Sequence, residues 1–191
     1  DFMCMDRREF LQVSAGAAGA SLLSCSSPPS SDSDQLSPIP ESVRKLSPML
    51  DGITPISEDE RWARIEKAQK LMTDHGMAAV YMESGSSLFY FTGVRWGRSE
   101  RMFAAVLPAK GDLAYVCAKF EEDRARELIK FGDDIRTWEE DENPCFRVAE
   151  IFKDRGIATG QVGMEERVRF FLFDGIRKEA PGIEYVSADP V

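Results

Sequence analysis

Residues 77–93 read Met-Ala-Ala-Val-Tyr-Met-Glu-Ser-Gly-Ser-Ser-Leu-Phe-Tyr-Phe-Thr-Gly. The compact apolar run of residues 77–82 predicts a buried strand. Residues 84–92 predict a short helix, which Gly93 ends. A buried strand that leads directly into a helix is typical of α/β folds. This stretch therefore sets the fold class, and the flanking sequence determines how many strands join it.

A helix is predicted before this strand. Ser57 and Glu60 form a capping box, and Gly76 stands where a helix ends. The helix has an apolar stripe at helical spacing, made of Trp62, Ile65, Ala68 and Met72. His75 falls in the last turn, where stabilisation of the helix dipole or simple exposure is a better interpretation than a ligand role.

Strands and helices alternate after Gly93. Residues 102–107 and 113–117 predict two strands joined by a turn at 108–112. The later elements are a helix at 120–131, a strand at 134–138, a helix from Asn143-Pro144 to Gly156, a strand at 161–165, a helix with Val168, Phe171, Leu172, Gly175 and Ile176 on its inner face, and a strand at 183–187. The sum predicts an α/β domain with a mixed six-stranded sheet flanked by helices.

Composition excludes several classes of function. The 191 residues carry a net charge of −9, which argues against nucleic acid as a partner because phosphate binding needs clustered Lys and Arg. His75 is the only histidine, and the four cysteines form no Cys-x-x-Cys pair. A histidine-rich metal site is therefore excluded by counting.

The N-terminus has the pattern of an export signal. Arg7 and Arg8, followed by Phe10 and Leu11, resemble the twin-arginine consensus. An apolar run at 13–23, too short for a bilayer span of ~20 residues, leads to a lipobox-like Leu-Leu-Ser-Cys that ends at Cys25. Residues 1–25 thus predict an exported chain lipidated at Cys25, in the periplasm or on the outer face of the cell membrane. The alternatives are a short buried helix, or cleavage elsewhere to give a free periplasmic protein.

Residues 26–54 are rich in Ser and Pro and predict a flexible linker, so the membrane is expected as a partner only through the lipid anchor. The folded domain is expected over 55–191.

Several segments of that domain carry a family likeness. Ser87-Leu-Phe-Tyr-Phe-Thr-Gly93 resembles an Asn-x-x-Tyr-Leu-Thr-Gly segment, with Ser87 where Asn is common. Gln161-Val-Gly-Met-Glu165 and the ending at 179–190 resemble further segments of the same pattern. In this order and spacing the segments resemble the N-terminal domain of creatinase, prolidase and aminopeptidase P. The resemblance implies a ribonuclease H-like motif in the sheet domain.

The resemblance also implies what else belongs to such an enzyme. The family's catalytic domain binds two divalent metal ions (Mn, Co or Zn) through two Asp, one His and two Glu, and it would follow residue 191. The expectation is therefore no catalytic residue, no metal and no cofactor in this chain. The expected partners are its own catalytic domain, further copies of the chain in a homo-oligomer, and a peptide substrate. The alternative is a stand-alone, lipid-anchored binding module without peptidase activity.

Residues 92–101 give the candidate binding site. Arg95, Arg98 and Arg101 surround Trp96 in a Gly-punctuated loop between two buried elements. Arginine forks suit carboxylates such as a peptide C-terminus. The resemblance implies that this edge can face a catalytic cleft, often that of a neighbouring subunit. The alternative is a solvated loop whose arginines pair with Glu100 or other nearby acids.

Three further groups have simpler interpretations. The acidic run at 139–142 is expected to be solvated and favourable to the following helix rather than a cation site. Cys117 and Cys145 are expected as two buried thiols rather than a disulfide. Phe170, Phe171 and Phe173 are expected to be core residues with one exposed ring.

Overall fold

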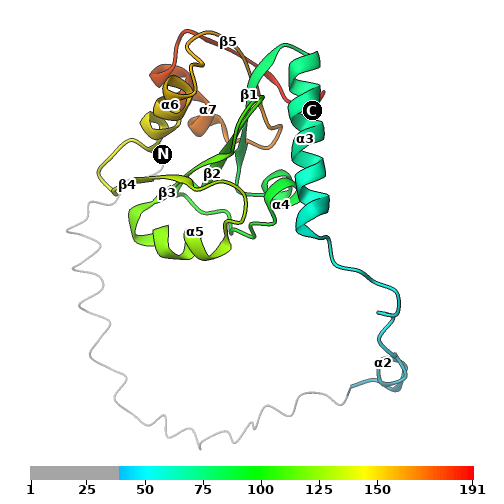
Figure 1. Ribbon diagram of the computed structural model, residues 1–191. Coiled ribbons are helices and arrows are strands. Elements are labelled where there is room, and N and C mark those ends of the chain that lie inside the picture. Colours follow the sequence, from blue (N-terminus) through cyan, green and yellow to red (C-terminus); the bar gives the residue numbers. More distant parts are fainter. Residues whose placement is uncertain (1–38) are drawn as a thin grey trace, which may run out of the picture. The chain divides into compact units, whose positions relative to one another are not determined.

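The computed structural model describes residues 39–191 (Figure 1). The predicted signal residues, Arg7, Arg8, Phe10, Leu11 and Cys25, lie outside the described residues, as does the first part of the predicted linker. The chain separates into two compact units between Ile53 and Thr54, and each is described by itself. No helix among residues 39–191 has both the length and the apolar character that crossing a membrane requires.

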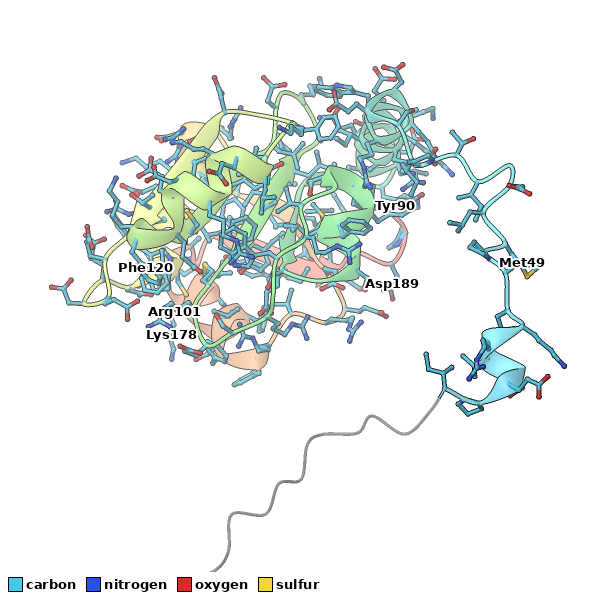
Figure 2. The ribbon with its side chains drawn as sticks, turned by 90° about the horizontal axis from the view of Figure 1, so that it is seen from below. Met49, Tyr90, Arg101, Phe120, Lys178 and Asp189 are labelled. Atoms are coloured by element: carbon cyan, nitrogen blue, oxygen red, sulfur yellow. The ribbon has the colours of Figure 1, made fainter. Side chains whose placement is uncertain are left out.

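Residues 39–53 contain one short helix, α2 (Glu41–Arg44). The large apolar side chains of this segment are exposed, and Met49 is the most exposed of them, at 88% (Figure 2). The others are Ile39, Val43, Leu46, Leu50 and Ile53. This part of the predicted linker thus presents apolar side chains to solvent.

Residues 54–191 form an α/β domain with the predicted order of elements. The order is α3 (Glu58–Asp74), β1 (Met77–Glu83), α4 (Ser86–Thr92), β2 (Ala104–Pro108), β3 (Ala114–Ala118), η1 (Lys119–Glu121), α5 (Glu122–Leu128), β4 (Asp134–Trp138), α6 (Pro144–Asp154), β5 (Gly160–Met164), α7 (Phe170–Glu179) and β6 (Ile183–Ser187). The caps form as expected: Ser57 accepts from the backbone N–H of Glu60 at 3.1 Å, and Asn143 from that of Cys145 at 3.1 Å.

The six strands form one mixed sheet, which confirms the predicted fold class. Their order is β4-β3-β2-β1-β5-β6. The β1–β2 and β2–β3 pairs are antiparallel, whereas β3–β4, β1–β5 and β5–β6 are parallel. From β1 the chain continues to β2, which lies on one side of the β1–β5 pair, and from β5 it continues to β6, which lies on the other side. The carboxyl ends of β1 and β5 are therefore a topological switch point, where α/β sheets place ligands.

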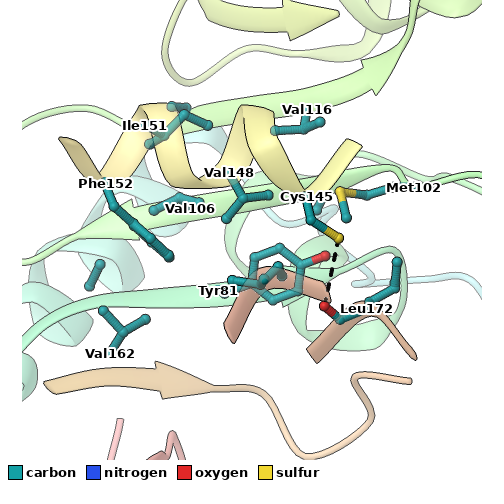
Figure 3. Close-up of a cluster of buried hydrophobic side chains, with 14 of the residues drawn as sticks. Tyr81, Met102, Val106, Val116, Cys145, Val148, Ile151, Phe152, Val162 and Leu172 are labelled. Atoms are coloured by element: carbon teal, nitrogen blue, oxygen red, sulfur yellow. Dashed lines mark hydrogen bonds between the residues drawn. The ribbon is translucent and has the colours of Figure 1, made fainter. Parts of the chain in front are cut away.

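Helices cover both faces of the sheet. Alternate residues of β1 point to opposite faces, so Ala79 and Tyr81 pack with α6 and α7, while Val80 and Met82 pack with α3, α4 and α5. Figure 3 shows the first cluster, in which Tyr81 lies beside Cys145 and Leu172. The Tyr81 hydroxyl is buried and has no hydrogen-bond partner among the described residues, and burial raises its pKa well above the usual value.

Two predicted helix features are wrong in detail. The helix expected at 120–131 is a 3₁₀ turn followed by α5, which ends at Leu128 because Ile129 takes up an extended conformation. This change of direction lets Phe131 enter the core. Trp62 is not a core residue of α3. It remains 41% exposed and contacts the Phe131 ring edge-to-face at 5.1 Å, while Arg61 is buried in the same turn.

The expectation of two buried thiols is confirmed. Cys117 and Cys145 are free and buried, and they belong to the clusters on opposite faces of the sheet. Burial raises the pKa of the Cys117 thiol to about 12 and that of Cys145 to about 11. Both groups are therefore neutral at physiological pH, and the sheet between them prevents a disulfide.

The expectation for the phenylalanines is only partly correct. Phe173 packs against Tyr185 edge-to-face at 5.7 Å, but two rings are exposed rather than one, namely Phe170 (76%) and Phe171 (54%). Leu172 and Ile176 are buried on the inner face of α7 as predicted, whereas Phe171, which was also predicted there, is exposed.

Candidate functional site

Two arginines of α3 hold the C-terminal end of α4. Arg61 donates to the backbone carbonyls of Phe89 and Tyr90, the second at 3.0 Å, and Arg64 donates to that of Tyr90 at 3.0 Å. The Phe89 carbonyl also accepts from the backbone N–H of Gly93 at 2.9 Å, while the Tyr90 carbonyl belongs to the last turn, whose carbonyls a helix end leaves without helical partners. Gly93 follows with φ +75°, and a Cβ there would lie 2.9 Å from Arg61 Nε. Glycine at position 93 is therefore required by the backbone conformation and by the arginine that packs against it.

Two segments of the family pattern meet at the carboxyl ends of β1 and β5. The Ser87 hydroxyl donates to Glu165 Oε1 at 3.0 Å, and Glu165 Oε2 accepts from the backbone N–H of Arg167 at 3.2 Å. Ser87 thus makes a specific contact at the position where Asn is common. A pocket of about 180 Å³ opens beside this pair, lined by Val80, Met82, Ser87, Phe91, Glu165, Glu166, Ala188, Asp189 and Val191.

The loop of residues 94–103, here called the arginine loop, is fixed by Trp96. Its indole is buried, stacks on Phe103 with a centroid distance of 3.9 Å and an interplanar angle of 9°, and is covered by the Arg124 guanidinium at 4.8 Å. The ring is an anchor for the loop, and this burial makes it unavailable as a surface contact.

The three arginines of the loop have different surroundings. Arg95 is exposed and lies over the Phe89 ring at 5.1 Å. Arg98 donates to the backbone carbonyls of Ser84 at 3.3 Å and Arg167 at 3.4 Å. Arg101 pairs with Glu100 and, through two hydrogen bonds of 2.6 and 3.2 Å, with Glu140. The alternative interpretation, in which the charges are paired, therefore describes Arg101 and in part Arg98, whose Nε lies 3.9 Å from a Glu83 carboxylate oxygen. Arg95 has no carboxylate partner among the described residues.

Arg101 also lies over Phe120 at 5.2 Å, and Figure 2 shows the two side chains at one surface. This contact and the Glu140 pair tie the arginine loop to the neighbouring segments.

A buried carboxylate, which the sequence did not reveal, connects this loop to α7. The Glu83 side chain is inaccessible to solvent at the end of β1, and it accepts from Arg169 Nε at 2.6 Å and from the Arg169 backbone N–H at 3.2 Å. Arg98 Nε lies 3.9 Å from the same carboxylate. The only signal in the sequence was an acidic residue that ends an apolar strand, and its partner is 86 residues away.

The acidic run at 139–142 is used in local contacts. Glu142 accepts from the backbone N–H of Glu139 at 2.9 Å and from Arg147 at 3.2 Å, and these contacts lower its pKa. The hydrogen bond from Arg101 likewise lowers the pKa of Glu140. His75 is exposed at the end of α3. No group of three or more His, Cys, Asp or Glu within residues 39–191 is arranged to hold a metal ion.

Comparison with known proteins identifies the class. The description "Creatinase/Prolidase N-terminal domain" matches residues 64–191, so the chain belongs to this family. Relatives of known structure show the same fold. A prolidase of Thermococcus sibiricus is 22% identical, with a TM-score of 0.61 over 73% of this chain and 36% of its own. The N-terminal domain of an X-Pro dipeptidase of Streptococcus pyogenes is 15% identical, with a TM-score of 0.55 over 65% of this chain and 99% of its own.

Two relatives reach higher identity. A dipeptidase of Pyrococcus horikoshii is 25% identical, with a TM-score of 0.57 over 65% of this chain and 33% of its own. An uncharacterised peptidase of Staphylococcus haemolyticus is 32% identical over 82 residues, which cover 43% of this chain and 23% of that protein. This chain therefore spans at most about a third of the length of these two relatives. Residues 64–191 are therefore a creatinase/prolidase N-terminal domain.

Proposed function

We propose that this chain is the non-catalytic N-terminal domain of an exported Xaa-Pro peptidase-type hydrolase, where it shapes substrate access and contributes to oligomer contacts. Family membership supports the parent enzyme class. The observation that carries the role is the arginine loop, which the buried Trp96 holds in place. Arg95 is exposed on this loop, and the Arg98 side chain, anchored by the backbone carbonyl of Ser84 and by Glu83, is still 36% exposed. A rigid loop with available guanidinium groups suits recognition of a substrate carboxylate.

The metal chemistry of such an enzyme is assigned to the separate catalytic domain. A centre of two divalent ions needs several carboxylate and imidazole ligands. The residues described here do not fit that requirement, because they form no ligand cluster and the single imidazole, His75, is exposed at a helix end. In this proposal no step of peptide hydrolysis passes through residues 39–191.

Kinetics of a polypeptide that joins this domain to its catalytic domain tests the role. Arg98→Ala is expected to raise KM for Xaa-Pro dipeptides about fivefold with little change in kcat, because an exposed charged contact to the substrate is lost. Arg126→Ala, at an exposed arginine of α5 that pairs with Glu122, is the matched control. An unchanged KM for Arg98→Ala would favour the solvated-loop alternative.

Export is a separate part of the proposal and rests on the sequence of residues 1–25. Replacement of Arg7 and Arg8 by lysine is expected to retain the protein in the cytoplasm. Mass spectrometry of the membrane fraction is expected to find Cys25 as a lipidated N-terminal residue. A mature chain that retains Arg7 and Arg8 would contradict this prediction.

A further inference from the structure

Residues 39–53, here called the apolar segment, form a unit of their own that contains no buried helix residue. Their six large apolar side chains are between 50% and 88% exposed, and these are Ile39, Val43, Leu46, Met49, Leu50 and Ile53. Single exposed apolar residues are normal on a protein surface, whereas a dense run of them marks a contact with a partner or a membrane.

The apolar residues of this segment have the spacing of one helix face. They stand at intervals of four, three, four and three residues, at Ile39, Val43, Leu46, Leu50 and Ile53. On the same helical period the charged residues fall on the opposite side, and these are Glu41, Arg44, Lys45 and Asp51. Only the turn of α2 is helical here, and Pro48 prevents one continuous helix. The segment therefore has an amphipathic pattern with no apolar surface of its own to pack against.

The charge of the apolar segment differs from that of the whole chain. Its two acidic and two basic residues cancel, and Lys45 pairs with Glu41 at 2.9 Å, whereas the 191 residues together carry a net charge of −9. An anionic phospholipid surface attracts basic segments and repels acidic ones. The apolar segment can therefore approach such a surface without the electrostatic cost that the acidic chain as a whole would have.

The predicted lipid attachment point limits how far the apolar segment can be from a membrane. Cys25 precedes Ile39 by 14 residues, which span at most about 50 Å at ~3.6 Å per residue. The first helix of the α/β domain begins later, at Glu58. Along the chain, the segment thus lies between the attachment point and the domain. A lipid on Cys25 would give it a bilayer surface at high effective concentration.

We propose that the apolar segment lies in the interface of a phospholipid bilayer, with its apolar stripe toward the acyl chains and its charged residues toward water. Amphipathic segments bind membranes in this orientation, and a lipid anchor holds a protein more durably when a second membrane contact supports it. The inference rests on the export and lipidation of the proposed function. It goes beyond them because it assigns the membrane a contact with the polypeptide as well as with the lipid.

Fluorescence of a labelled chain tests this placement. The 191-residue chain is prepared with Cys4→Ser and Cys25→Ser, so that no lipid is attached, while Cys117 and Cys145 are buried and remain unlabelled. One cysteine is then introduced in the apolar segment and carries a nitrobenzoxadiazole label, whose emission moves to shorter wavelength in an apolar medium. The vesicles consist of phosphatidylethanolamine and phosphatidylglycerol.

The position of the label distinguishes insertion of one face from general proximity to the vesicle. Labels attached through Leu46→Cys and Leu50→Cys are expected to shift to shorter wavelength when vesicles are added, because both positions belong to the apolar stripe. Labels attached through Arg44→Cys and Asp51→Cys, on the charged side, are expected to keep the emission that they have in water.

A pair of matched double variants tests whether the apolar side chains drive the contact. With the label at Leu46→Cys, Val43→Asn/Leu50→Asn should weaken vesicle binding of the segment at least about tenfold, because two apolar side chains no longer leave water. Glu41→Asn/Asp51→Asn introduces the same two asparagines on the charged side and should leave the shift of the label in place.

Three results would overturn the assignment. These are labels that behave alike on the two sides of the segment, an unchanged shift in Val43→Asn/Leu50→Asn, and a shift that appears without vesicles and grows with protein concentration, which would show that a second copy covers the segment. The test involves neither export nor lipid attachment. If Cys25 is not lipidated in cells while the labels shift as expected, the proposed export fails and the membrane contact stands. Lipidation without label shifts would show that the membrane contact alone is wrong.

Discussion

Replacement of Glu83 by glutamine should destabilise the domain strongly. The change preserves the shape of the side chain but removes its charge. Arg169, which donates to the Glu83 carboxylate from Nε at 2.6 Å, would then keep a part-buried guanidinium without a counter-charge. The end of β1, the start of α7 and the arginine loop would lose the group that connects them.

The magnitude follows from burial. Removal of one partner from a buried ion pair costs about 3–5 kcal/mol. Since the Arg169 side chain is 24% exposed while that of Glu83 is inaccessible, the lower end of this range, about 3 kcal/mol, is expected. Small domains have unfolding free energies of about 5–15 kcal/mol, so the loss is a large fraction of the total.

Urea unfolding followed by tryptophan fluorescence measures this loss. Glu140→Gln is the matched control because its pair with Arg101 is exposed, and it should change stability little. The double variant Glu83→Gln/Arg169→Met should recover part of the loss, because no uncompensated charge remains. The reasoning is refuted if Glu83→Gln costs less than about 1 kcal/mol, or if it costs no more than the control.

Three other perturbations follow from the packing. Gly175→Ala should lower the free energy of unfolding in urea by about 1–2 kcal/mol, although alanine has the better helix propensity, because the new Cβ would lie 2.4 Å from Cys145 Sγ. If the additional change Cys145→Ala does not restore stability, this explanation is wrong. The free energy of unfolding should fall as the pH rises from about 9 toward 12, because the thiols of the unfolded chain lose their protons before the buried ones do. Replacing Cys117 by valine should make the melting temperature depend less on pH across that range. An unchanged pH dependence would contradict the raised pKa of Cys117. Arg61→Met should cost about 1–3 kcal/mol and speed amide hydrogen exchange in α4, whereas unchanged exchange would show that the arginine does not hold this helix.

Local signals were sufficient to predict most of the fold. Ser57 and Asn143 each satisfy a backbone N–H within three residues, and Gly93 ends α4 in a conformation that glycine favours. The central strands β1, β2 and β3 could be predicted because both faces of the sheet are covered there, which makes them nearly continuous apolar runs.

Features that depend on distant partners could not be predicted. Helical spacing could not show that Arg61 is buried and Trp62 is not, because the reason is the set of α4 carbonyls that Arg61 reaches. The burial of Trp96 depends on Phe103 and Arg124, and the role of Glu83 depends on a residue from another element. The sequence therefore proposes the arginine loop as a candidate site, while the partners of each of its arginines could be seen only in the structure.

The central claim is that this domain supplies recognition while metal-dependent hydrolysis takes place elsewhere. Its most direct test is release of proline from Gly-Pro by the purified 191-residue chain with added Mn²⁺. The account predicts binding of the dipeptide with no hydrolysis above the protein-free control. Release of proline that requires the metal, stops with a chelator and follows the chain through every purification step would contradict it.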